Sequence, residues 1–177
     1  WETCPQGVNT GGFGLSVRTE DIARFGQLYL QEGLWRGQRL IPASWVAEAT
    51  AIHSDNSSQT NPDWKQGYGY QFWRCRHNAY RGDGAYGQFC VVMPDQDAVL
   101  AITSGVRDMQ AVLDTVWEHL LPGMAPDSLT ADPAAEARLQ RVLAERMVPP
   151  AQGAAHAPLG REVDGRYSLD ANPYGLR

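Results

Sequence analysis

The fold is decided by residues 89–102, which read FCVVMPDQDAVLAI. Two continuously apolar runs, Phe89–Met93 and Ala98–Ile102, flank the polar segment 94–97. Short runs rich in valine, isoleucine and phenylalanine favour strands, whereas proline and aspartate favour turns. The stretch therefore predicts two strands joined by a turn. Strands that are apolar at every position are typical of the middle of a sheet, so we expect helices on both faces.

The segments on either side extend this arrangement. Residues 67–75 are rich in Tyr, Phe and Trp, which favour a strand, and residues 76–78 predict a turn into a returning strand at 79–83. After the sheet, apolar side chains recur at helical spacing over residues 109–120. We therefore predict an α+β fold in which an antiparallel sheet is packed by helices.

Two helices are expected before the sheet. Thr19 is placed to cap the first, which continues until Gly33 ends it. Pro42 suits the first position of the second, which runs to about residue 51. Residues 33–38 predict a turn between short extended pieces, and the polar residues 52–65 predict an exposed loop without regular structure.

The carboxy-terminal third of the sequence changes in composition. Residues 133–147 predict an amphipathic helix, with Leu139, Val142 and Leu143 on one face. Residues 148–160 consist mainly of Pro, Ala and Gly and are typical of a linker. We therefore predict one domain over residues 1–147, the linker, and the start of a β-rich appendage over 161–177.

Composition excludes several classes of function. The 177 residues have a net charge of −5, with one Lys against fourteen Arg and no basic cluster, so nucleic acid is not an expected partner. No apolar run is long enough to span a membrane. Cys4, Cys75 and Cys90 have no zinc-binding spacing, and we expect them to be reduced, which favours the cytoplasm. No metal or other cofactor is expected.

Two stretches resemble a known family. Residues 11–50 contain GGFGLSVRTEDIARFGQLYL followed by GLWRGQRLIPASWV, and residues 68–105 contain YGYQFW, GDGAYGQ and VVMPDQDAVLAITSG. Both resemble, in the same order, segments of the β-lactamase-related serine hydrolases, which include class C β-lactamases, penicillin-binding proteins and esterases. The resemblance implies the carboxy-terminal part of a β-lactamase/transpeptidase-like fold.

The resemblance also implies acyl transfer through an acyl-enzyme. In this family a Ser-x-x-Lys serine attacks a carbonyl, a second motif such as Tyr-x-Asn helps to move its proton, and backbone N–H groups stabilise the oxyanion. No serine of this chain is followed by Lys at the third position, because Lys65 is the sole lysine and Pro62 precedes it by three. No tyrosine begins a Tyr-x-Asn motif. We therefore expect the missing groups to lie in an amino-terminal part of the same domain, and this chain to be inactive alone.

The third motif of the family is matched by residues 82–88. By resemblance, the backbone N–H of Ala85 is one oxyanion donor, and five neighbours contribute to substrate binding: Gly82, Asp83, Gly84, Tyr86 and Gln88. Gly82 departs from the family, which has Lys or His at that place to bind a substrate carboxylate. The resemblance therefore favours neutral esters, amides or peptides over β-lactams as substrates.

Structural interpretations of the same residues stay open. Glycines at positions 82, 84 and 87 also suit a strand that bends or passes close to another backbone. Tyr86 and Gln88 suit a half-buried strand face, and Asp83 suits a solvated or locally bonded carboxylate. We expect Trp45, Trp73 and Trp117 to be packing residues.

Two hypotheses compete with the one that the chain is part of an active serine hydrolase. In the first, the chain is a non-catalytic relative that binds a peptide or protein partner. In the second, it is a fragment that associates with itself through exposed apolar faces.

Overall fold

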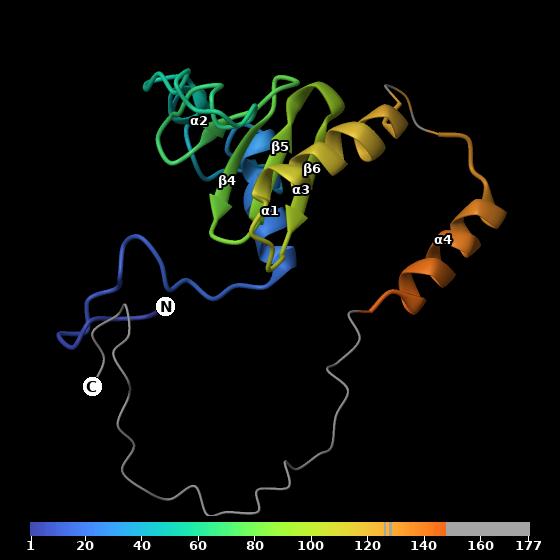
Figure 1. Ribbon diagram of the computed structural model, residues 1–177, viewed down its shortest axis with the longest axis horizontal. Coiled ribbons are helices and arrows are strands. Elements are labelled where there is room, and N and C mark those ends of the chain that lie inside the picture. Colours follow the sequence, from blue (N-terminus) through green and yellow to red (C-terminus); the bar gives the residue numbers. More distant parts are fainter. Residues whose placement is uncertain (126, 128, 148–177) are drawn as a thin grey trace, which may run out of the picture. The chain divides into compact units, whose positions relative to one another are not determined.

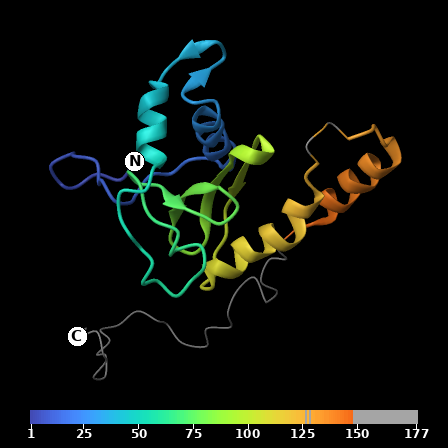
Figure 2. The ribbon, with the colours of Figure 1, turned by 90° about the horizontal axis from the view of Figure 1, so that it is seen from above.

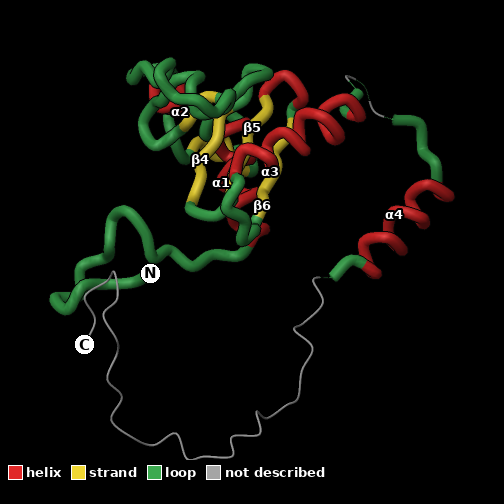
Figure 3. Tube along the Cα trace, viewed as in Figure 1, coloured by secondary structure: helices red, strands yellow, loops and turns green. Residues whose placement is uncertain are grey.

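The computed structural model of the protein describes residues 1–125, 127 and 129–147. The chain divides into two units, Trp1–Leu129 and Thr130–Arg177. The first unit combines helices with antiparallel strands (Figure 3). The predicted α+β class, an antiparallel sheet packed by helices, is therefore confirmed. Among the described residues, we find no helix with the length and apolar character that a membrane span requires.

A four-stranded antiparallel sheet forms the centre of the first unit. Its strands lie in the order β3 (Trp73–Arg74), β4 (Tyr80–Gly84), β5 (Gln88–Met93) and β6 (Ala98–Ile102). A 3₁₀ segment at Pro94–Gln96 joins β5 to β6, as the stretch 89–102 predicts. Strand β5 is almost completely buried, whereas β6 is half-buried throughout. The prediction that helices cover both faces of these strands therefore describes β5 better than β6.

Two helices cover opposite faces of this sheet. Helix α1 lies behind the sheet and α3 (Met109–Thr115) lies in front of it, and the view from above agrees (Figures 1 and 2). On the α3 face, Phe89, Val91 and Met93 pack with Leu113. On the α1 face, Val92 belongs to a second cluster that also contains aromatic residues of α1 and β4. Because successive side chains of β5 point to opposite faces of the sheet, this strand contributes to the hydrophobic core on each face.

Helix α1 spans Thr19–Leu30, close to the predicted range. The prediction that Thr19 caps it is wrong, because Arg18 is the capping residue and makes no side-chain capping bond. The end is as predicted: the N–H of Gly33 donates to the Leu28 carbonyl at 2.8 Å, with a positive φ of 85° at the glycine. This bond is the 6→1 bond of a Schellman motif, in which the left-handed residue after the C-cap is Glu32, with a φ of 51°, and Gly33 follows it.

A hairpin and a second helix follow α1. Strands β1 (Leu34–Trp35) and β2 (Gln38–Arg39) pair antiparallel around a two-residue turn. Both turn residues, Arg36 and Gly37, have positive φ angles, as tight hairpin turns require. Helix α2 spans Ala43–Thr50, which confirms the predicted second helix, but Pro42 is its capping residue and not its first helical residue as expected.

The segment between α2 and the sheet differs from the prediction in two ways. Residues 67–75 form a strand only at β3, because Gly67 and Gln71 have positive φ angles that interrupt extended backbone. Residues 52–65 lack a helix or strand, as expected, but they are not all exposed. Asp63 is completely buried. The loop therefore contains a buried polar residue that its composition does not predict.

The remaining helices follow the sheet. Helix α3 continues as a wider π-helical stretch, η2 (Val116–Leu120), and a 3₁₀ turn, η3 (Leu121–Gly123). In the second unit, α4 spans Pro133–Glu145 and is capped by Asp132, whose side chain accepts from the N–H of Ala135. The apolar residues expected on one face of α4 are exposed: Leu139, Val142 and Leu143. The predicted linker and appendage lie outside the described residues, so the boundary after Met147 stays a prediction.

The three tryptophans expected to be packing residues differ in how deeply they are buried. Trp117 is buried in the core on the α3 face, and Trp73 is half-buried against neighbouring aromatic rings. Trp45 packs against the Tyr70 ring at a centroid distance of 5.7 Å but remains 48% exposed, so it lies at the surface and outside the core. The cysteines Cys4, Cys75 and Cys90 are all free, as predicted.

Candidate functional site

The residues matched to the third family motif surround a tight turn at one end of the sheet. Strands β4 and β5 pair until Gly84 lies opposite Gln88, and the three residues between them form the turn. Ala85 and Tyr86 are exposed, and Tyr86 retains 60% of its accessible surface. Ala85, the candidate oxyanion donor, thus lies at the surface, in a turn between two paired strands. We call residues 84–88 the β4–β5 turn.

Ser104, two residues after β6, braces this turn. Its hydroxyl lies 2.8 Å from both the Tyr86 and the Gly87 carbonyl oxygens. The N–H of Val106 also donates to the Tyr86 carbonyl at 3.0 Å. In addition, the side-chain amide of Gln88 donates a hydrogen bond to the Ser104 carbonyl. These bonds fix the backbone of the turn against the segment that follows the sheet.

Glycine is required at one position of the turn and not at another. Gly87 has a φ of 85°, and a Cβ there would lie 2.3 Å from the Ser104 hydroxyl oxygen. A Cβ on Gly82 would meet nothing within 4 Å, and its φ is not in the left-handed region. The structural interpretation of the glycines therefore holds for Gly87, whereas neither close packing nor a positive φ requires glycine at position 82.

Asp83 is held by a buried arginine on the same face of β4. The Nε of Arg81 donates to Asp83 Oδ2 at 3.2 Å, and Nη2 lies 3.0 Å from the same oxygen without hydrogen-bond geometry. The Asp83 side chain is 13% exposed. Burial raises the pKa of this carboxyl, and the charge of Arg81 opposes the rise. Asp83 is therefore locally bonded and shielded from solvent.

Arg81 joins this end of the sheet to the loop before β3. Its guanidinium is completely buried and lies 4.2 Å from the centroid of the Trp64 ring. Its Nη1 donates to the Asp63 carbonyl oxygen at 2.8 Å and to the Cys75 sulfur at 3.0 Å. A cation placed over an aromatic face is stabilised by the ring quadrupole, which offsets part of its lost hydration.

The Asp63 carboxylate forms a second buried group, which sequence reasoning missed. It accepts hydrogen bonds from Arg76 Nη2 at 2.8 Å, Gln110 Nε2 at 2.7 Å and Trp117 Nε1 at 3.0 Å. Asp114 shares the same Arg76 group at 2.6 Å. Burial alone raises the pKa of Asp63, but these hydrogen bonds outweigh it and lower the pKa to about 2. We call these five residues the Asp63 network.

These features define what the site offers chemically. The β4–β5 turn presents rigid backbone at the end of a sheet, and the charged groups beneath it are paired with one another. Within residues 1–125, 127 and 129–147, no group of three or more His, Cys, Asp or Glu side chains is arranged to hold a metal ion. The arrangement is suited to backbone hydrogen bonding of a polar ligand atom.

The chain was compared with known proteins in three ways. No protein-family model matches it, and no curated protein matches it. Among solved structures, it is similar to a Bacillus anthracis protein described as a 6-aminohexanoate-dimer hydrolase, with 24% sequence identity and a TM-score of 0.45. The match covers 59% of this chain and 27% of that chain. A similarity of this size does not decide the function of this protein.

Proposed function

We propose that these residues form the carboxy-terminal part of a β-lactamase-related serine hydrolase that acts through an acyl-enzyme. The observation that supports this most directly is the braced β4–β5 turn, which contains the sequence matched to the family's third motif. In the proposed role, the N–H of Ala85 donates to the carbonyl oxygen of the substrate. The remaining catalytic groups belong to a part of the same domain that precedes these residues.

The chemistry explains why rigidity at this turn matters. When a serine attacks an ester or amide carbonyl, negative charge develops on the carbonyl oxygen. A backbone donor stabilises that charge best when it is already oriented and needs no rearrangement. The hydroxyl of Ser104 fixes the two carbonyl groups that follow Ala85. Loss of one such donor typically lowers kcat by about 100-fold to 1,000-fold.

The charges near the turn suggest the class of substrate. Gly82 supplies no cation, and Arg81 is completely buried and paired with Asp83. A substrate carboxylate therefore gains no charged partner from these strand residues. We infer that the hydrolase acts on neutral esters, amides or peptides in preference to anionic β-lactams.

The test compares two polypeptides, residues 1–177 alone and the same chain with the residues encoded before it. Each is assayed with a short-chain p-nitrophenyl ester and with a chromogenic cephalosporin. We expect the longer polypeptide to hydrolyse the ester faster than the cephalosporin, and a serine-directed phosphonate to stop it. Residues 1–177 alone should give no phosphonate-sensitive turnover, because they contain no Ser-x-x-Lys.

Two results would change the proposal. Phosphonate-sensitive turnover by residues 1–177 alone would contradict the assignment of the nucleophile to another segment. A folded longer polypeptide without Ser-x-x-Lys and without turnover would favour the non-catalytic, partner-binding hypothesis.

The space beside Gly82 permits a sharper test of specificity. Because a Cβ at this position meets no atom within 4 Å, Gly82→Lys should fold and place a cation beside the turn. We expect this variant of the longer polypeptide to have a lower KM for the anionic cephalosporin. Gly82→Met, which has a side chain of similar length without charge, is the matched control. Equal effects of Lys and Met would show that charge at this position does not select the substrate.

A further inference from the structure

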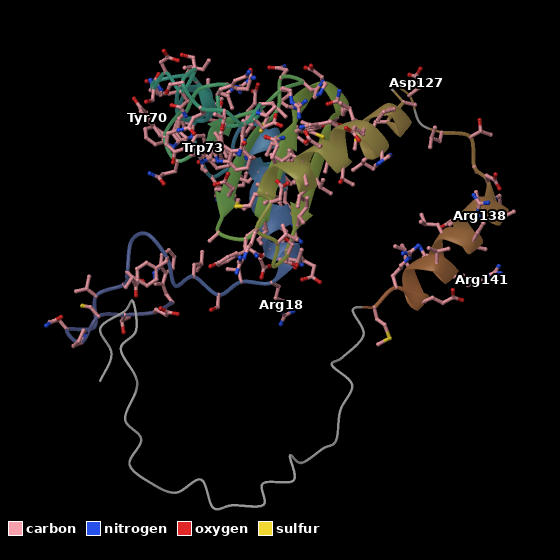
Figure 4. The ribbon with its side chains drawn as sticks, in the orientation of Figure 1. Arg18, Tyr70, Trp73, Asp127, Arg138 and Arg141 are labelled. Atoms are coloured by element: carbon pink, nitrogen blue, oxygen red, sulfur yellow. The ribbon has the colours of Figure 1, made fainter. Side chains whose placement is uncertain are left out.

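A group of aromatic and acidic side chains lies on the surface around α2. We call it the Trp45 corner: Trp45, Glu48, His53 and Tyr70. Trp45 is 48% exposed and Tyr70 is 43% exposed, so both rings present accessible surface. Figure 4 shows Tyr70 at the outer edge of the loops beside α2. None of these residues belongs to the β4–β5 turn.

The rings of the corner form an ordered stack. The imidazole of His53 lies parallel to the Tyr70 ring, with centroids 4.2 Å apart and planes 8° apart. The Trp45 ring meets Tyr70 at a centroid distance of 5.7 Å and a tilt of 34°. Trp45 is 48% exposed, so nearly half of its surface is accessible to a ligand.

A carboxylate is fixed beside these rings. Glu48 lies three residues after Trp45 in α2, so the two side chains share one helix face. The Tyr70 hydroxyl donates to Glu48 Oε1 at 3.2 Å, and His53 Nε2 lies 3.8 Å from the same oxygen. The Glu48 side chain remains 55% exposed. The corner therefore combines accessible aromatic surface with a negative charge.

Backbone contacts hold this arrangement in place. The N–H of Tyr70 donates to the Ala49 carbonyl at 2.8 Å, and the N–H of His53 donates to the Tyr68 carbonyl at 2.9 Å. A Cβ on Gly69 would lie 2.2 Å from the Ala49 oxygen, so the loop packs directly on the end of α2. A ligand would consequently meet preformed rings and lose little affinity to ordering them.

Electrostatics decides which ligand chemistry suits the corner. The faces of aromatic rings are negative, and they attract cations, most strongly when the ring is an indole. Glu48 adds a full negative charge. A compact ammonium such as that of lysine is strongly hydrated, whereas an alkylated ammonium also presents apolar surface to the rings. The corner is therefore complementary in both charge and polarity to an alkylated ammonium group.

We propose that the Trp45 corner binds organic cations that contain a quaternary ammonium group. The cation lies against the exposed face of Trp45, within reach of the Glu48 carboxylate. This inference does not depend on the proposed hydrolase activity, and it is testable with residues 1–177 alone.

The probe is choline, compared with its uncharged carbon isostere, dimethylbutanol. Binding is followed by nuclear magnetic resonance, using the indole N–H signals of the six tryptophans, with the Trp45 signal assigned from its loss in Trp45→Phe. We expect choline to shift the Trp45 signal in a saturable manner, and dimethylbutanol to bind more weakly. Trp45→Ala should weaken choline binding about twofold to fivefold, as loss of one cation–π contact at an exposed ring predicts.

Two further variants separate charge from general apolar contact. Glu48→Gln keeps the shape of the side chain and should weaken choline binding without changing the affinity for dimethylbutanol. Trp1→Ala removes another exposed tryptophan, 56% accessible, and should leave choline binding unchanged. Near-ultraviolet circular dichroism establishes that each variant keeps its tertiary structure. Equal binding of choline and dimethylbutanol, preferential binding of a neutral sugar, or no choline-dependent shift of Trp45 in the folded protein would each overturn the proposal.

Discussion

The β4–β5 turn and the Asp63 network are both rigid, but they are built in different ways. The turn is one continuous segment, braced mainly through backbone carbonyl and N–H groups that contact residues 104–106. The network joins side chains from the loop before β3, the turn before β4, helix α3 and η2. The comparison suggests that the turn tolerates many side-chain changes, whereas the network depends on particular side chains.

The largest expected effect is the loss of Asp63. Asp63→Ala leaves the buried donors of Gln110 and Trp117, and the half-buried guanidinium of Arg76, without their shared acceptor. A buried donor left without an acceptor costs about 1–3 kcal/mol, and Arg76 is one third exposed and keeps Asp114 as a partner, so we expect a total loss of about 2–4 kcal/mol in the free energy of unfolding. Urea denaturation followed by circular dichroism measures this change. The matched control is Asp55→Ala, because Asp55 is exposed and should change the free energy far less. Equal effects would contradict the special role of the network.

The next effect is the response of the network to acid. The pKa of Asp63 is lowered from 3.8 to about 2 in the folded protein, so its contribution to stability is complete above about pH 4 and is lost as the pH falls towards 2. That contribution is about 2 kcal/mol. Denaturation curves between these pH values should show a shallower pH dependence in Asp63→Asn than in the original protein. The same slope in both proteins would show that other carboxylates account for the acid sensitivity.

Two glycines of the motif should respond differently to the same substitution. Gly87→Ala imposes a Cβ on a left-handed backbone and pushes it against the Ser104 hydroxyl, which should cost about 1–3 kcal/mol. Gly82→Ala meets open space and should change the free energy of unfolding by less than about 0.5 kcal/mol. Thermal or urea unfolding of the pair provides the measurement. If Gly82→Ala were the more damaging change, the structure of the turn would be wrong.

The smallest expected effect comes from the brace itself. Ser104→Ala removes the hydroxyl that contacts two turn carbonyls and should cost about 1 kcal/mol, since the contact with the Tyr86 carbonyl is exposed and the contact with the Gly87 carbonyl is only part-buried. Hydrogen exchange should nevertheless speed up at the Val106 N–H, which donates to the same turn. Ser16→Ala, at an exposed serine before α1, is the control. No change in exchange at Val106 would argue against the bracing role of Ser104.

The two regions also differ in how well sequence predicts them. Strands β5 and β6 were predictable because their apolar runs and the turn residues between them are continuous in sequence. The part played by Ser104 was not, because a hydroxyl that bonds backbone carbonyls leaves no periodic pattern. Asp63 lies in a polar stretch that is typical of an exposed loop, and its partners are 13 to 54 residues away. Its burial depends on tertiary contacts that local sequence does not encode.

The same limit applies to the tryptophans. Trp117 and Trp45 both occur among apolar residues in helical segments, yet one is buried and the other is nearly half exposed. The difference arises from which helix face meets the sheet, and a short helix such as α2 gives too few turns to identify that face. The Trp45 corner could therefore be recognised only from the structure.

The central claim is that the β4–β5 turn faces a reactive serine donated by a preceding segment of the same polypeptide. The most direct test is to label the longer polypeptide with a fluorophosphonate and identify the modified residue by mass spectrometry. We predict a single modified serine, in a Ser-x-x-Lys motif outside residues 1–177. Modification of Ser104 or of any other serine within residues 1–177, together with loss of hydrolysis, would contradict it.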